Sequence, residues 1–66
     1  MTYKELLDEG VRRLSDAQIL EASTDAWRLM QFVFKISRLD YLMNPQKNAA
    51  DALKAQYESC ILKRST

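Results

Sequence analysis

The fold is decided by residues 21–35, which read EASTDAWRLMQFVFK. Apolar residues in this stretch recur at helical spacing along one stripe, and others lie beside it. The stripe consists of Ala26, Leu29, Met30 and Val33, with Trp27, Phe32 and Phe34 on neighbouring faces. The polar residues form a single narrow line, namely Thr24, Arg28, Gln31 and Lys35. A helix that is apolar nearly all round belongs in the middle of a bundle, so we predict a central helix here.

A flanking helix is predicted over residues 3–15. Thr2 and Glu5 have the spacing of a capping box, in which each side chain accepts the backbone N–H of the other residue. Apolar residues then recur at helical spacing, with charges between them: Tyr3, Leu6, Leu7, Val11 and Leu14. Gly10 inside this stretch costs about 1 kcal/mol relative to alanine, unless a neighbouring backbone needs the room.

A short third helix is predicted over residues 38–43. Ser37 is a suitable N-cap for it. Its buried side is expected to consist of Leu39, Leu42 and Met43. The chain must break after this helix, because Pro45 disfavours helical geometry in the residue before it.

The last helix is expected to start near Asn48, a suitable N-cap, and to end near Lys63. Its apolar face carries Leu53, Tyr57, Cys60 and Ile61. A chain of 66 residues has room for one domain only. The predicted fold class is therefore all-α, a small bundle of about four helices over residues 1–66.

Composition excludes several classes of function. Ten basic and nine acidic residues give a net charge of +1, without the basic excess typical of nucleic-acid binding. No apolar run approaches the ~20 residues needed to cross a bilayer, and the N-terminus lacks the layout of a signal peptide. With one cysteine and no histidine, neither an internal disulfide nor a zinc site is expected, and Cys60 lacks an activating partner. We expect a cytoplasmic, non-catalytic chain.

A set of scattered residues then points to a family. They are Leu14, Ala17-Gln18-Ile19, Glu21-Ala22, Asp25-Ala26, Leu29-Met30, residues 37–42, Tyr57, Ile61-Leu62 and Lys63-Arg64. In this order they resemble the N-terminal domain of the PrmC/HemK-type methyltransferases, which modify the glutamine of the Gly-Gly-Gln motif in class I peptide-chain release factors. The chain departs from that pattern at Gln18, where the family often has glycine, and a left-handed backbone there would suit glutamine less well.

The resemblance implies a helical module that helps to recognise the release factor. Its partners would be that factor and the catalytic domain of a full-length parent, expected after Thr66. The family's Asn-Pro-Pro-Tyr motif and glycine-rich S-adenosylmethionine loop are absent, and Asn44-Pro45-Gln46 lacks the second proline and the aromatic residue. We therefore expect no catalytic, cofactor-binding or metal-binding residue in this chain. S-adenosylmethionine would be bound by the catalytic domain of the parent, and that domain would be the glutamine methyltransferase.

Basic side chains beside an exposed apolar patch are the candidates for binding a partner. The core is expected to bury most of Ala26, Leu29, Met30 and Val33 against Leu6, Val11, Leu53, Tyr57 and Ile61. That leaves more apolar residues on the second and third helices than a short bundle covers. The basic candidates are Arg28, Arg38, Lys63 and Arg64. Arg64 could instead bridge the two domains of the parent, and each of the four could be an ordinary solvated charge.

Two other functions remain open on the sequence alone. The chain could be a free-standing helical protein-interaction module, including a homodimer, whose apolar second helix is covered by a partner. It could also be a small helical nucleic-acid binder, a reading that the net charge of +1 weakens. We expect no membrane partner and no direct contact with nucleic acid.

Overall fold

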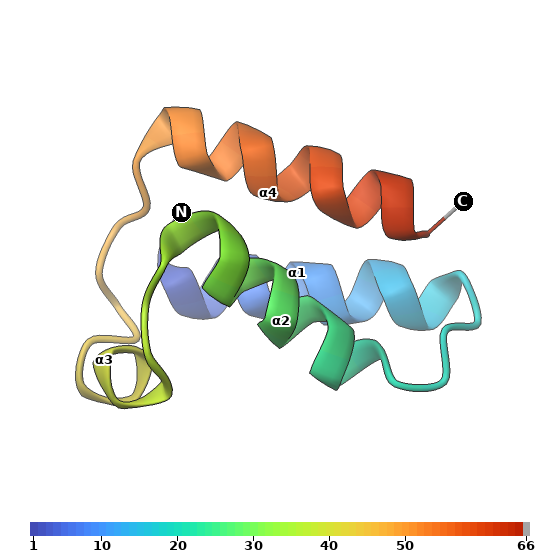
Figure 1. The fold of residues 1–66 in the computed structure, drawn as a ribbon, viewed down its shortest axis with the longest axis horizontal. Helices are drawn as coiled ribbons and strands as arrows, with labels where there is room; N and C mark the ends of the chain where they lie inside the picture. The colour runs from blue at the N-terminus through green and yellow to red at the C-terminus, as the bar shows by residue number, and fades with distance from the viewer. Residues whose placement is uncertain (66) are drawn as a thin grey trace.

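A computed structural model describes residues 1–65. Thr66, the last residue of the predicted domain, lies outside the described residues. The helices are α1 (Tyr3–Asp16), α2 (Ala22–Phe34), α3 (Arg38–Met43) and α4 (Asp51–Arg64). Helices α1, α2 and α4 each pack against the other two, and the short α3 lies at one end of them (Figure 1). The prediction of a small all-α bundle is confirmed. None of the helices in the described part of the chain is long and apolar enough to cross a membrane.

Two capping boxes fix where helices begin. The Thr2 backbone N–H donates to Glu5 Oε1 at 2.9 Å, and the Glu5 N–H donates to Thr2 Oγ1 at 3.2 Å. This hydrogen bond from the Thr2 backbone holds the pKa of Glu5 below its ordinary value. Ser37 and Asp40 make the same reciprocal pair at the start of α3, with distances of 3.1 and 3.3 Å. Both sites satisfy backbone donors that a helix start leaves without partners, so the predicted starts at Thr2 and Ser37 are confirmed.

Within residues 1–65, two residues other than glycine have a left-handed backbone. Lys35 ends α2 with φ at 55°, and its N–H donates to the carbonyl oxygen of Gln31 at 2.8 Å. Gln18 lies in the turn after α1 with φ at 64°, and its N–H donates to the carbonyl oxygen of Ser15. The left-handed region is costly for a residue with a Cβ. Gln18 thus adopts the backbone conformation that the family's glycine at this place suggested.

The predicted start of α4 near Asn48 is wrong. Asn48 instead pairs its backbone with Thr2 in an isolated antiparallel bridge, and the Ala49 N–H donates to the carbonyl oxygen of Met1. The helix begins at Asp51, after an N-cap residue, Ala50, that makes no side-chain capping bond. The competing partner comes from the other end of the chain, so local capping preference did not reveal it.

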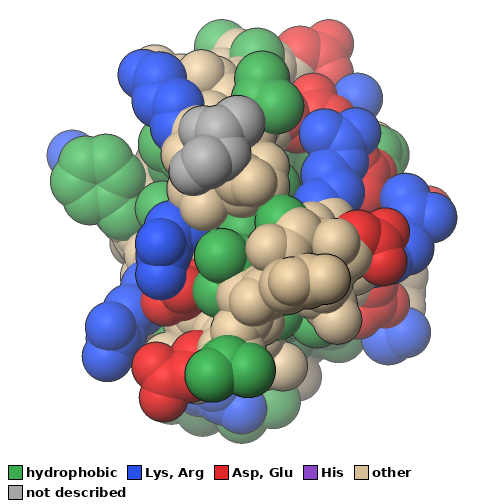
Figure 2. Space-filling view, turned by 90° about the vertical axis from the view of Figure 1, so that its right-hand side faces the viewer, with side chains coloured by type: hydrophobic (Ala, Val, Ile, Leu, Met, Phe, Trp, Pro, Cys, Tyr) green, Lys and Arg blue, Asp and Glu red, His purple; other side chains and the backbone are tan. Residues whose placement is uncertain are grey.

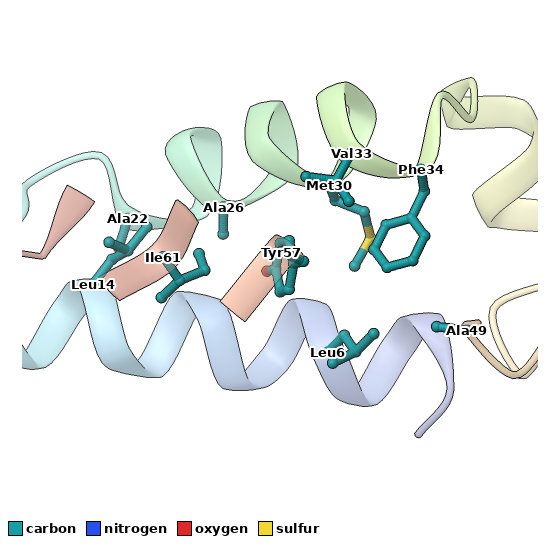
Figure 3. Packing of buried hydrophobic residues seen from close by; sticks show 10 residues of the cluster. All are labelled: Leu6, Leu14, Ala22, Ala26, Met30, Val33, Phe34, Ala49, Tyr57 and Ile61. Carbon is teal, nitrogen blue, oxygen red and sulfur yellow. The ribbon is translucent and has the colours of Figure 1, made fainter. Parts of the chain in front are cut away.

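The core lies between α1, α2 and α4. Its buried side chains, drawn in Figure 3, are Leu6, Leu14, Ala22, Ala26, Met30, Val33, Phe34, Ala49, Tyr57 and Ile61. Three residues expected in the core, Val11, Leu29 and Leu53, are partly buried and pack against it, as does Cys60. Three aromatic rings pack together where α1 begins and α2 ends: Phe34 lies 5.2 Å from Tyr3 and 6.0 Å from Tyr57 between ring centroids.

Gly10 gives Tyr57 its place in the core. A Cβ at position 10 would collide with the Tyr57 hydroxyl and lie 3.1 Å from Ile61 Cδ1. The sequence suggested that Gly10 could make room for a neighbouring backbone, but the room is occupied by the Tyr57 side chain instead. The Tyr57 hydroxyl is fully buried and has no hydrogen-bond partner among residues 1–65. Its burial, with Glu9 nearby, raises the pKa of Tyr57 above its ordinary value.

The predicted buried side of α3 is also wrong. Leu39, Leu42 and Met43 are 65%, 62% and 70% exposed, and no residue of α3 is buried. The side chain that α3 turns towards the bundle is Tyr41, which meets the Trp27 ring edge-on with 5.4 Å between centroids. Since Tyr41 takes the inner face, the three aliphatic side chains are left on the outer one.

Candidate interaction surface

A groove runs between α1 and α2 and is closed at one end by α3. Its volume is about 530 Å³, within the range of roughly 300–1,000 Å³ typical of ligand pockets. The apolar side chains that line it are Leu7, Val11, Trp27 and Tyr41. All four are partly buried and pack against the core. The groove is thus an apolar depression whose walls the bundle holds in place.

Trp27 is the centre of one wall of this groove. The Arg38 guanidinium lies over its indole ring, 5.4 Å from the ring centroid, and Tyr41 packs against it edge-on. A cation over a tryptophan face is attracted by the ring's negative face. This stacking brings α3 against α2 and orients Arg38 at the groove. Trp27, expected mainly as a core residue, is therefore a wall of the groove as well as a core contact.

Charged residues line the rim of the groove. Asp8, Arg12 and Asp16 lie one turn apart along α1, and Arg38 faces them from α3. Asp8 already forms an ion pair with Lys4 at 3.7 Å. Burial raises the pKa of the Tyr41 hydroxyl above its ordinary value, with the negative charge of Asp8 as a second cause. Neither guanidinium on the rim forms an ion pair within residues 1–65.

Apolar side chains are exposed outside the groove as well. On α3 they are Leu39, Leu42 and Met43, and on α2 Phe32 is 74% exposed. An excess of apolar residues on these two helices was expected, and the structure confirms it. Phe32 also qualifies the prediction that α2 is covered on several sides: α1 and α4 pack against it, while Phe32 and the polar line remain exposed.

The structure does not gather the four basic candidates into one site. Arg38 is at the groove, whereas Arg28 is exposed on the polar line of α2. Arg64, at the end of α4, binds Asp25 at the start of α2 through Nε at 3.1 Å and through a terminal nitrogen at 2.9 Å. Lys63 precedes it on the same helix. In the end-on view of Figure 2, Lys and Arg side chains lie on both flanks of the molecule rather than in one patch.

The groove is lined by apolar, charged and hydroxyl side chains. Among residues 1–65, no three Cys, Asp or Glu side chains come together in a way that could hold a metal ion. The groove combines aromatic and aliphatic walls with guanidinium groups and serine hydroxyls at its edge. Such an arrangement can hold an apolar side chain and pair with a charge beside it.

The groove was not predicted from the sequence. Leu7 and Val11 were assigned to the apolar stripe of the first helix and Trp27 to a face beside the stripe of the second, while Tyr41 was noted only as part of a resemblance. One signal was present: Trp27 lies off the main stripe of its helix, which indicates a side chain at the edge of the core.

The fold is that of a small all-α bundle, with an apolar groove lined by side chains of α1, α2 and α3. The family of PrmC N-terminal domains matches residues 5–66, nearly the whole chain, and the chain belongs to this family. Comparisons with curated proteins and with solved structures give no match. The family assignment confirms the resemblance seen in the sequence.

Proposed function

We propose that this chain is the recruitment domain of a release factor glutamine methyltransferase, which acts on class I release factors in the cytoplasm. The observation that supports this proposal is the family match over residues 5–66. The groove beside Trp27 and the exposed apolar residues of α3 give such a domain surfaces for protein contact. Methyl transfer and S-adenosylmethionine binding then belong to a separate catalytic domain of the parent.

The proposal is tested by comparing two substrates of the parent methyltransferase, with and without the domain. For the intact release factor, deletion should raise KM with little change in kcat, since recruitment contributes binding that is equal in ground and transition states. For a short peptide carrying the Gly-Gly-Gln motif, deletion should change neither constant. Equal losses on both substrates would show that the domain supports the catalytic domain's fold instead, and no loss on either would reject recruitment.

The division of labour also concerns the cofactor. The helical chain offers no glycine-rich turn after a strand, the feature that lets a backbone approach such a ligand. Titration calorimetry of the isolated chain with S-adenosylmethionine should give no saturable binding at micromolar concentration. Saturable binding would contradict the assignment of the cofactor to the other domain.

A second candidate function is self-association through α3. It is favoured by the exposure of Leu39, Leu42 and Met43, which lie at helical spacing on one face. Light scattering on the purified chain decides it. A dimer that Leu42→Lys converts to a monomer would support a homodimeric module, whereas a monomer at all concentrations would leave α3 available to another partner.

A further inference from the structure

The groove between α1 and α2 has the features of a specific contact site rather than of an accidental depression. Its floor is apolar and aromatic, and Leu7, Val11 and Trp27 are fixed there by contact with the core. Arg38 is held at its edge by stacking on Trp27, with the ring 5.4 Å from the guanidinium carbon. A side chain that enters such a site meets walls already in place, which lowers the entropic cost of binding.

The charges on the rim distinguish among possible occupants. Arg12 lines the groove from α1 and Arg38 lines its closed end from α3, and neither forms an ion pair within the described part of the chain. Of the two rim carboxylates, Asp8 is already paired with Lys4. Asp16, one turn from Arg12, forms no ion pair within residues 1–65. Two guanidinium groups and one carboxylate are then left to interact with a ligand, so their summed charge is positive. A guanidinium recognises a carboxylate with directed, often bidentate, hydrogen bonds.

We propose that this groove binds a segment of the release factor that presents an apolar side chain next to a carboxylate. The apolar side chain fills the depression between Val11 and Trp27, and the carboxylate is bound by Arg12 and Arg38. This inference rests on the proposed function and adds to it the surface of the chain that makes the contact. It also separates the basic candidates, because Arg38 takes part and Arg28, on the exposed polar line, does not.

The single tryptophan allows the site to be observed directly. The chain labelled with ¹⁵N has one indole N–H signal, and its ring is a wall of the groove. Titration with unlabelled, unmethylated release factor should shift or broaden this signal in step with binding measured by calorimetry. If the release factor does not bind the chain at all, the recruitment function and the groove proposal both fail. If it binds while the indole signal stays unchanged, the groove proposal alone fails.

Matched variants test the rim. Glutamine is preferred to glutamate at position 12, since a third acid between Asp8 and Asp16 would weaken α1 by repulsion at i,i+4 spacing. The double variant Arg12→Gln/Arg38→Gln should bind release factor about ten- to hundredfold more weakly, the range expected for one or two hydrogen bonds to charged groups. Lysine at both positions should restore part of the affinity. The control variant Arg28→Gln changes the same residue type one position from Trp27. It should bind release factor as tightly as the unsubstituted chain does.

Circular dichroism and thermal melting confirm that each variant is folded before its affinity is compared. Raised salt should weaken release factor binding by the unsubstituted chain more than binding by the double glutamine variant, because only the unsubstituted chain has the charge pairing that salt screens. Equal affinity of the double variant and the unsubstituted chain for release factor would overturn the proposal. A loss confined to Arg28→Gln would overturn it too, by placing the contact on the polar line of α2.

Discussion

Arg64 and Asp25 join the end of α4 to the start of α2, with two guanidinium nitrogens within 3.1 Å of one carboxylate oxygen. Asp25 is only 14% exposed, while Arg64 is 53% exposed. Each residue also lies where the helix dipole favours its charge, since Asp25 is in a first turn and Arg64 in a last turn. The pair adds an ionic contact to the apolar packing between these two helices.

The first prediction concerns this ion pair. A double-mutant cycle with Asp25→Asn and Arg64→Gln should give a coupling free energy of about 0.5–1 kcal/mol, the upper part of the range for exposed pairs. Urea unfolding of the four proteins provides the measurement. The coupling should shrink at high salt, because one partner is half exposed. A coupling of zero at low salt would show that the contact contributes nothing to stability.

The second prediction concerns Gly10. On helix propensity alone, Gly10→Ala should stabilise α1 by about 1 kcal/mol. The new Cβ would collide with the buried Tyr57 hydroxyl, and overpacking of this kind costs about 1–3 kcal/mol, so we expect net destabilisation. Thermal melting should show the loss clearly, since 1 kcal/mol shifts the Tm of a domain this small by about 4–8 °C.

The control for Gly10→Ala is the same substitution made together with Tyr57→Phe. Removal of the hydroxyl takes away the worst collision and leaves contacts of 3.1 Å to Ile61 Cδ1 and to the ring carbon Cζ. The alanine should therefore be tolerated better in that background. The same loss in both backgrounds would mean that the collision with the hydroxyl is not the cause.

The third prediction is that Tyr57→Phe stabilises the protein by about 1 kcal/mol. A buried hydroxyl without a hydrogen-bond partner carries a desolvation cost of roughly 1–3 kcal/mol, which phenylalanine does not have. Urea unfolding at neutral pH measures the difference. A clear destabilisation would indicate that the Tyr57 hydroxyl does have a partner in solution.

The raised pKa of Tyr57 also predicts that folding stability depends on pH. Its pKa is raised in the folded protein above the unfolded value of 10.0, so above pH 10 the unfolded state loses the proton more readily than the folded state. Folding stability is therefore complete below pH 10 and falls as the pH rises further. The Tyr57→Phe variant should lose less stability between pH 9 and pH 11 than the unsubstituted chain. The smaller loss that remains in the variant is expected from Tyr41, whose pKa is also raised.

The fourth prediction concerns the left-handed residue in the first turn. Gln18→Gly should relieve a backbone penalty of about 1–2 kcal/mol, offset in part by the greater freedom of glycine in the unfolded chain, about 0.4–1 kcal/mol. A net gain of up to about 1 kcal/mol is expected in urea unfolding. Gln18→Ala, which keeps the Cβ, should show no gain. If glycine and alanine behave alike, the φ of 64° is not a source of strain.

The sequence predicted most of the fold because its main signals are local. The capping boxes at Thr2 and Ser37, and the apolar stripe through Ala26 and Met30, depend on residues within a few positions of one another. Those elements form where they were expected. Helix type and order follow from this short-range pattern with no knowledge of the packing.

The errors arise where distant residues compete with local preference. Asn48 is a good N-cap, yet it pairs with Thr2, and Leu39 loses the inner face of α3 because Tyr41 packs on Trp27. The groove is of the same kind, since its walls come from α1, α2 and α3. Periodicity identifies which residues can be buried in each helix, but the hollow between helices depends on how they meet.

The backbone pairing of Thr2 with Asn48 joins the start of the chain to the connection before α4. The first two amides of α1, those of Tyr3 and Lys4, donate to carbonyl oxygens of Lys47 and Pro45, although first-turn amides are usually left to solvent. We therefore expect the start of α1 and the connection before α4 to open as one unit in hydrogen exchange. Helix α3 buries none of its residues, and its Arg38 and Tyr41 contact Trp27. Its place at the end of the groove therefore depends on two attachments: the contacts of Arg38 and Tyr41 with Trp27, and the connection after it, which is hydrogen-bonded to the start of α1.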